Sequence, residues 1–492
     1  MLVTLVACYF AVTICIGFYA ARRVKNSADY LVAGRSLPLY MNTATVFATW
    51  FGAELILAVS STFLKEGLQG VVGDPFGAAF CLIFVALFLA APYYRLKLMT
   101  VGDFYKKRYN RTVELASAAA ISISYLGWSS ANLVALGIVI HTVSGNTITL
   151  EQGIVLGAVI VGVYTLFGGM WSVAFTDLFQ TVIIVAGLIY IAWMLAGMAG
   201  GVDKVVATAQ ASDRLKFFPG ASLHDWLGFI AAFVTMALGS VAQQDVFQRV
   251  TSARTEKIAR QGTLLGGSLY LLMAFIPMFI AVSALLIDPA MVKQMLSNEN
   301  DFQQVLPTLI LQRTPLFAQV LFFGALLSAI LSTASGTLLA PTAVITENVI
   351  QPLWGHKLSD RKMLVLLRLI LIGFTCCVTL FALQSESSMY QMVQDAYKVT
   401  LVAAFTPLIF GMFWRRATPQ GALLSMFCGV VAWQYAEHFM SDALVPPQLV
   451  GLGSAIAGMV VGSLAPTLMG GQGHPEIVDL ARQPEVADNP PA

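Results

Sequence analysis

Long apolar runs recur along the whole chain, and this feature limits the possible folds more than any other. A stretch of about 18 or more apolar residues is long enough to cross the hydrocarbon core of a bilayer as a helix. Only 11% of the 492 residues are charged and 58% are hydrophobic, whereas soluble domains carry roughly 25% charged residues. The alternating segments typical of outer-membrane barrels are missing from the sequence. The chain is therefore predicted to be an all-α polytopic membrane protein.

Hydropathy divides the chain into about 13 transmembrane helices. Their approximate limits are 2–21, 40–64, 71–94, 113–142, 152–170, 173–197, 225–246, 263–288, 316–345, 364–383, 391–413, 419–437 and 448–468. Residues 1–469 are thus expected to form a single transmembrane domain. The remaining segment, 470–492, is rich in glycine, proline and acidic residues, which predicts a disordered tail.

The distribution of basic residues predicts the orientation of these spans. Charges follow the first apolar run instead of preceding it, so this run is expected to be a retained helix with its N-terminus outside. With that choice, 21 of the 28 lysine and arginine residues fall in or beside cytoplasmic segments and six in outside loops. Such an excess is the positive-inside pattern of membrane proteins. The C-terminal tail is then cytoplasmic.

Thirteen spans in this orientation contain a hidden symmetry. Spans two to six, about 40–197, and spans seven to eleven, about 225–413, form two sets of five helices. An odd number of helices inverts the second set relative to the first, as in many secondary transporters. The first helix of each set carries glycine beside polar residues at membrane depth, in "ATWFGAELI" (48–56) and "LGSVAQQDVF" (238–247). Both helices are predicted to be broken there, beside a binding site near the midplane.

A third unusual stretch, "GALLSAILSTASG" (324–336), crowds small hydroxyl residues into an apolar helix. Small residues allow helices to approach closely in a membrane, so helix packing is one explanation. The other explanation is an ion site, because the adjacent hydroxyls of Ser332 and Thr333 can face a single point. Spacing alone leaves both explanations open.

Three longer motifs resemble the sodium/solute symporter family, which includes sodium-coupled proline, sugar and choline transporters. They are "SADYLVAGRSL" (27–37), "GGMWSVAFTD" (168–177) and "SAILSTASGTLLAPTAVITEN" (328–348). The resemblance covers nearly the whole chain, from about residue 5 to 468. It implies a LeuT-type fold, which is a core of two inverted repeats of five helices. It also implies sodium-coupled uptake of a small organic solute by alternating access.

The resemblance implies a sodium site made mostly of neutral oxygen atoms. The matching positions are the backbone carbonyls of Ala48 and Phe51 on the first broken helix, and the carbonyl of Ala329 with the hydroxyls of Ser332 and Thr333. Sodium is a hard cation that prefers oxygen ligands, as the alkaline-earth ions do. The hydroxyl-rich stretch is accordingly assigned to sodium binding.

Two aspartates have alternative interpretations. Asp177 matches an aspartate that the family places near the sodium exit path, or it is a structural cap at the start of span six. Asp74, near the outer end of span three, is expected to be solvated at the membrane interface. Asp245, Asp395 and Lys398 could pair or cap, since ionisable groups at membrane depth are rarely without a partner.

The expected substrate site surrounds the two breaks. Its members are Trp50, Gly52, Glu54, Trp128, Gln243 and Gln244. The family's choline transporter carries tryptophans at positions matching Trp50 and Trp128, but the third tryptophan of that site is replaced here by Gln243. The proline transporter has an aspartate where this chain has Trp50. Aromatic faces attract cations, so an amino acid or a related amine is the first choice; organic cations, sugars and carboxylates remain alternatives.

Two other classes of function fit the sequence poorly. A channel would need a ring of charges or a repeated filter segment, and an enzyme would need a nucleophile and base or a metal cluster. The expected partners are sodium, the solute and the lipid bilayer, with no nucleic acid and no required oligomer. The expected location is the cell membrane, specifically a bacterial inner membrane.

Overall fold

The computed structural model describes residues 2–297, 302–354, 358–385, 387–440 and 443–466, with residues 476 and 478. In these residues the regular structure is helical, and the sole extended pairing is an isolated contact between Leu37 and Ala253. This confirms the predicted all-α class. The tail predicted to be disordered, 470–492, lies outside the described residues apart from positions 476 and 478.

The main helical elements before α11 come first in the chain. They are α1 (Leu2–Ala21), α2 (Ser27–Val32), α3 (Leu39–Trp50), η2 (Glu54–Val59), α4 (Ser60–Gly70), η3 (Val72–Gly77), α5 (Ala78–Phe84), η4 (Val85–Leu89), α6 (Ala90–Leu96), α7 (Val101–Arg108), α8 (Arg111–Val143), α9 (Leu150–Ala199) and α10 (Val202–Ala211). The later elements are α11 (Leu223–Gly239), η5 (Ser240–Ala242), α12 (Gln244–Thr251), α13 (Glu256–Ile287), α14 (Pro289–Leu296), α15 (Val305–Arg313), α16 (Leu316–Val344), η7 (Ile345–Ile350), α17 (Asp360–Gln384), α18 (Met389–Thr400), η9 (Leu401–Phe405), α19 (Thr406–Phe413), α20 (Pro419–Phe439) and α21 (Pro447–Leu464).

Nine helices in the described part of the chain are long and apolar enough to cross a membrane, or ten if the bent pair α3 and η2–α4 is one span. α9 contains 50 residues, a length of about 75 Å at 1.5 Å per residue if it were straight. The bilayer core is only about 30 Å thick. Gly169 kinks the helix with φ of 49°, and a β-carbon there would lie 2.4 Å from the carbonyl oxygen of Tyr30. The predicted spans 152–170 and 173–197 are thus two parts of one kinked helix.

The predicted number of 13 spans and the ten found by length and hydropathy differ for identifiable reasons. α9 is one element where the sequence predicted two spans. The apolar part of α1, Ala7–Ala21, is shorter than a full span, and α20 is not among the ten. Adding α1, α20 and the second part of α9 to the ten restores the predicted number.

Both predicted helix breaks are present. α3 ends at Trp50, and the helix that resumes at Glu54 is bent from it by 53°. The second break falls at Gln243, whose φ of −75° and ψ of 141° are extended, between η5 and α12. The segment before α3 also pairs with the segment after α12, because Leu37 donates to Ser252 (3.0 Å) and accepts from Arg254 (3.0 Å).

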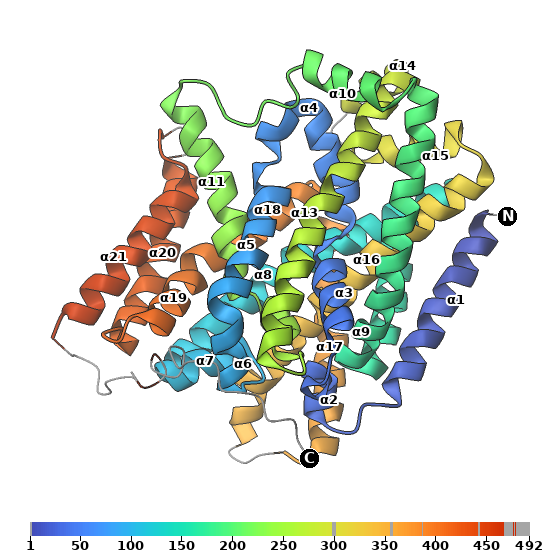
Figure 1. Cartoon of the computed structure of the whole chain (residues 1–492). Coiled ribbons are helices and arrows are strands. Elements are labelled where there is room, and N and C mark those ends of the chain that lie inside the picture. Colours follow the sequence, from blue (N-terminus) through green and yellow to red (C-terminus); the bar gives the residue numbers. More distant parts are fainter. Residues whose placement is uncertain are drawn as a thin grey trace.

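Both broken helices pack against a helix that is buried over most of its length. In α16, every residue from Ala325 to Val344 is buried, and the helix contacts α3, α8, α9 and α12. Figure 1 shows α1 at one edge of the molecule and α20 and α21 at the opposite edge, so all three lie outside this centre. α2, α6 and α7 gather at one end of the molecule and α10 and α14 at the other. A polar site on α16 is therefore at membrane depth and away from lipid.

Candidate functional site

The first break brings Gly52 against the hydroxyl of Thr333 on α16. A β-carbon on Gly52 would lie 2.9 Å from Thr333 Oγ1, so the absence of a side chain allows this close approach. The hydroxyl is fully buried and has no hydrogen-bond partner among the described residues. The N–H of Gly52 donates to the carbonyl of Trp50 (3.0 Å) instead of to Ala48. In a continuous helix, the N–H of Gly52 would bond the carbonyl of Ala48. The break removes this hydrogen bond beside the unpaired hydroxyl of Thr333.

Asp177 joins the same region from α9. Its carboxylate accepts hydrogen bonds from Ser332 Oγ on α16 (2.6 Å) and from Thr45 Oγ1 on α3. The aspartate is fully buried and lies eight residues beyond the kink at Gly169, inside a continuous helical segment. The alternative interpretation as a cap at a helix start is therefore wrong. We refer to Thr45, Asp177, Ser332 and Thr333 as the hydroxyl cluster.

Four aromatic rings meet on the other side of the first break. The ring of Trp50 lies 5.9 Å from Trp128 and 6.3 Å from Tyr397, with the latter pair stacked. Trp128 also lies 5.5 Å from Tyr397 and 6.0 Å from Tyr125. These rings come from α3, α8 and α18. Such electron-rich faces attract cations, most strongly where water is excluded.

Two buried carboxylates accept hydrogen bonds from these rings. Trp128 Nε1 donates to Glu54 Oε2 (2.9 Å), and Trp50 Nε1 donates to Asp245 Oδ2 (3.1 Å). Tyr125 OH donates to Asp245 Oδ1 (2.5 Å). Glu54 is 6% exposed and Asp245 is fully buried. We call the four rings with Glu54 and Asp245 the aromatic–carboxylate cluster.

A buried arginine lies between the two clusters. Arg249, one helical turn after Asp245, donates from Nε to Thr49 Oγ1 (3.0 Å). Its two terminal nitrogens have no hydrogen-bond partner among the described residues. The guanidinium is close enough to attract both Asp177 and Asp245. It thus supplies positive charge to an interior that is otherwise rich in carboxylates.

The two glutamines of the predicted substrate site have different surroundings. Gln243 Nε2 donates to Ser124 (3.0 Å) and Thr400 (3.4 Å), next to the aromatic rings of α8 and α18. Gln244 bonds the main chain before and at the start of α7, accepting from Val101 N (2.7 Å) and donating to Met99 O (3.3 Å). Of the two, only Gln243 is brought to the aromatic–carboxylate cluster.

Asp74 differs from its prediction. It was expected to be solvated, but it is only 2% exposed and accepts a hydrogen bond from Tyr270 of α13. It also lies close enough to Glu54 for the two charges to repel. The position near a span end suggested solvent, but α13 and α11 cover η3 from the side. Burial by a distant helix is not visible in local sequence.

Several residues of the site were not predicted from the sequence. Asp245 and Arg249 were not assigned to it, although both follow the second break at a spacing of four residues, which places them on one face of α12. Tyr125 and Tyr397 lie in no motif that the sequence analysis identified. Only the packing of α8 and α18 against each other and against η2 reveals them.

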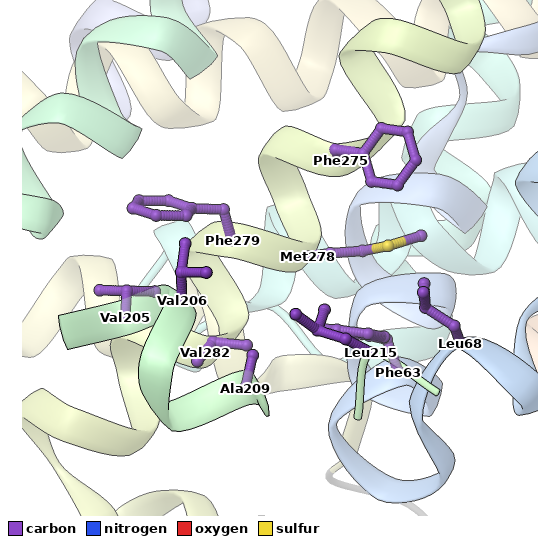
Figure 2. A pocket seen from close by; sticks show the side chains of 10 residues that line it. All are labelled: Phe63, Leu68, Val205, Val206, Ala209, Leu215, Phe275, Met278, Phe279 and Val282. Carbon is purple, nitrogen blue, oxygen red and sulfur yellow. The ribbon is translucent and has the colours of Figure 1, made fainter. Parts of the chain in front are cut away.

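One apolar cavity lies apart from both clusters. It has a volume of about 190 Å³ and is lined only by apolar side chains from α4, α10, α13 and the segment after α10, which Figure 2 shows in detail. A second cavity, of about 10 Å³, lies beside Trp50, Val246 and Arg249. This second cavity has space for roughly one water molecule.

Comparison with families and relatives agrees with this arrangement. The model of the sodium:solute symporter family matches residues 30–429. The high-affinity proline transporter PutP of Bacillus subtilis is 26% identical over 444 residues, which cover 87% of this chain and 91% of that protein. The high-affinity choline transporter 1 of Homo sapiens is 23% identical over 437 residues, covering 86% and 74%.

Solved structures show the same fold. A Na+-coupled sialic acid symporter in a substrate-bound outward-open state superposes with a TM-score of 0.79 at 18% identity, covering 94% of this chain and 97% of that one. Mhp1, a nucleobase-cation-symport-1 family transporter, gives 0.56 at 14% identity, covering 89% and 94%. The predicted LeuT-type fold is confirmed.

Proposed function

This chain belongs to the sodium:solute symporter family, and from that premise we propose that its solute is a small molecule with a cationic amine. Sodium-coupled solute transport is the activity of the family. The observation that carries the choice of an amine is the pair Glu54 and Asp245, two buried carboxylates bordered by four aromatic rings. A buried carboxylate without a cation is costly, and an ammonium group provides both charge and hydrogen-bond donors.

The rings and the carboxylates have separate tasks in this proposal. A carboxylate holds the ammonium group, and the faces of Trp50 and Trp128 cover the apolar part of the solute. In the structure, the indole N–H groups donate hydrogen bonds to the carboxylate oxygens. A solute ammonium then replaces neutral donors with charged ones, which form hydrogen bonds roughly twice as strong.

Sodium is proposed to bind in the hydroxyl cluster and the adjacent break. Its ligands would be the carbonyls of Ala48, Phe51 and Ala329 with the hydroxyls of Ser332 and Thr333. Three findings support this choice: the unpaired Thr333 hydroxyl, the diverted amide of Gly52, and the contact between them. Asp177, bonded to Ser332, would lie on the path by which the ion leaves.

The two sites are coupled through one short segment of chain. Trp50 and Glu54 belong to the solute site, and Phe51, between them, supplies a sodium ligand. Gly52, predicted from the sequence as part of the solute site, contacts Thr333 of the sodium site. A sodium ion that ties this segment to α16 also fixes the orientation of the solute site. We propose that this favours the outward-open state and that import follows by alternating access, from the outside of a bacterial inner membrane with the N-terminus outside.

Quaternary ammonium compounds are the second candidate, because they too are recognised by aromatic rings. The observation that favours them is the group of four neighbouring rings. A quaternary group has no N–H donor, however, and would leave the carboxylates of Glu54 and Asp245 without new hydrogen bonds. Sugars and carboxylates would match the buried acidic groups less well.

Uptake by reconstituted protein tests the proposal directly. Proteoliposomes with an inward sodium gradient should accumulate an amine, and replacing sodium with potassium should abolish accumulation. Panels of amino acids, amines, quaternary ammonium compounds, sugars and organic acids identify the solute class by competition. Sodium-driven uptake of a sugar or a carboxylate, with no effect of any amine, would contradict the proposed class. Labelling of single cysteines introduced at Ser212 and at Lys257 tests the proposed orientation, with only the first accessible from outside.

A further inference from the structure

We infer that the solute is a dication, with two ammonium groups separated by an apolar spacer, as in an α,ω-diamine. This inference rests on the proposed function and specifies its substrate class. It follows from the position of the two carboxylates among the four aromatic rings, from the acidic groups buried around the breaks, and from one buried hydroxyl without a hydrogen-bond partner among the described residues.

The two carboxylates are bonded by different members of the four aromatic rings. Glu54 belongs to the first broken helix and is bonded by Trp128. Asp245 belongs to the second broken helix and is bonded by Trp50 and Tyr125. The rings of Trp50 and Trp128 lie 5.9 Å apart, edge to face. An amine with one charge can satisfy one of these carboxylates, whereas a diamine can reach both while its methylene groups lie along the rings.

The charges buried around the breaks also favour a dication. Four carboxylates are buried in this region, those of Glu54, Asp74, Asp177 and Asp245, and one arginine, Arg249. Even with a bound sodium ion, acidic groups outnumber cations here by two, so a dicationic solute would allow all four carboxylates to be ionised. Glu54 is close enough to Asp74 and Asp245 to be repelled by both. A zwitterionic amino acid would leave this imbalance unchanged, and uncompensated buried charge is strongly unfavourable.

A buried hydroxyl gives an independent indication of a ligand. Tyr397 is fully buried, and its hydroxyl has no hydrogen-bond partner among the described residues. Its ring packs against those of Trp50 and Trp128, and its hydroxyl lies within electrostatic range of Glu54 and Asp245. A phenolic oxygen can accept a hydrogen bond from an ammonium group. The solute would thus satisfy a polar atom that the protein leaves unpaired.

Arg249 could instead bind the carboxylate of an amino acid, since its terminal nitrogens have no hydrogen-bond partner in the described structure. Against this, the guanidinium already faces Asp177 and Asp245 and is bonded to Thr49. Its charge is therefore engaged by the protein's own carboxylates. The zwitterion is included in the test as the competing outcome.

The test compares three probes of equal chain length in the presence of sodium. They are 1,4-diaminobutane, 1-aminobutane and 4-aminobutanoate, which carry two charges, one charge and a zwitterion. Binding to purified full-length protein is measured by thermal shift and by titration, and uptake in proteoliposomes. We expect the diamine to bind roughly 10- to 100-fold more tightly than the monoamine, the value of one additional charge-assisted hydrogen bond.

Variants locate the second charge. Glu54→Gln should bring the affinity for the diamine close to that for the monoamine, whereas the affinity for the monoamine should change less. Asp395→Asn removes a carboxylate that pairs with Lys398 at the surface (2.9 Å) and should leave all three affinities unchanged. If Glu54→Gln does not fold, the comparison of probes on the unmodified protein still decides.

The outcomes separate this inference from the proposed function. Equal or tighter binding of the monoamine or the zwitterion would overturn the dication and leave the amine in place. Binding of none of the three, together with sodium-dependent binding of a sugar or an organic acid, would overturn both. A preference for the diamine that persists in the Glu54→Gln variant would also overturn the inference, because another residue would then bind the second ammonium group.

Discussion

The hydroxyl cluster and the aromatic–carboxylate cluster meet at the same helix break but use opposite chemistry. Around Thr333 the polar groups are mostly neutral hydroxyls, with Asp177 as the single carboxylate. Around Trp50 the polar groups are carboxylates bordered by rings. A transported ion must be bound firmly enough to enter and loosely enough to leave, which neutral oxygen atoms permit. The larger solute is selected by charge and by aromatic area.

This difference predicts that the two clusters respond to different substitutions. Changes in the hydroxyl cluster should alter the sodium requirement first, and changes in the other cluster should alter solute affinity first. Residues 50 to 54 border both clusters, so a smaller effect on the second ligand is expected in each case.

The largest effect is expected from Asp245→Asn. It removes a charge that is bonded by Trp50 and Tyr125 and that faces Arg249. Hydrogen bonds to charged groups contribute about 1.5–3 kcal/mol each, so the uptake efficiency for an amine should fall by roughly 100-fold or more. Half-saturation by sodium should change by much less. An unchanged solute affinity in correctly folded Asp245→Asn protein would remove the aromatic–carboxylate cluster from the solute site.

Coupling between the clusters should give the next largest effect. Sodium is expected to tighten solute binding by roughly 5- to 150-fold, the usual range for coupling free energies of 1–3 kcal/mol. Linkage requires the solute to tighten sodium binding by the same factor. Titrations of solute at low and at saturating sodium, with potassium keeping the ionic strength constant, measure it. Equal affinities in both conditions would contradict thermodynamic coupling through this break.

Ser332→Ala and Thr333→Ala should each raise the sodium concentration for half-maximal uptake by several-fold to about tenfold, the value of one hydrogen-bonding group. Solute affinity at saturating sodium should stay nearly constant. Thr333→Ser, which keeps the hydroxyl, is the matched control and should resemble the unmodified protein. Sodium dependence that is unaltered in both alanine variants would place the ion elsewhere.

The smallest effect is expected from Gly52→Ala. The added β-carbon would lie 2.9 Å from Thr333 Oγ1, so the hydroxyl must move by a few tenths of an ångström or rotate. The sodium requirement should rise about two- to fivefold, a cost of about 1 kcal/mol or less. The double variant Gly52→Ala/Thr333→Ala should raise the sodium requirement by less than the two single effects combined, since contacting residues are coupled. Full additivity would indicate that Gly52 acts independently of Thr333.

The sequence by itself determined the membrane class, the two helix breaks and the family, because each is written in a short, local signal. Hydropathy identifies spans, and glycine beside polar residues at membrane depth marks a break. The adjacent hydroxyls of Ser332 and Thr333 were visible for the same reason. Local signals failed where burial depends on distant helices, as for Asp74, which α13 covers.

Tertiary structure alone decided which side chains share a site. Asp177 proved to be a partner of Ser332 and Thr45 and not a helix cap. Tyr125 and Tyr397, far apart in the chain, stack on Trp128 and Trp50, respectively, and complete the group of four rings. The physical reason is that a helix in a membrane protein can be apolar on every side, so its sequence does not tell which face meets another helix. Only the packing of α3, α8, α12, α16 and α18 fixes those contacts.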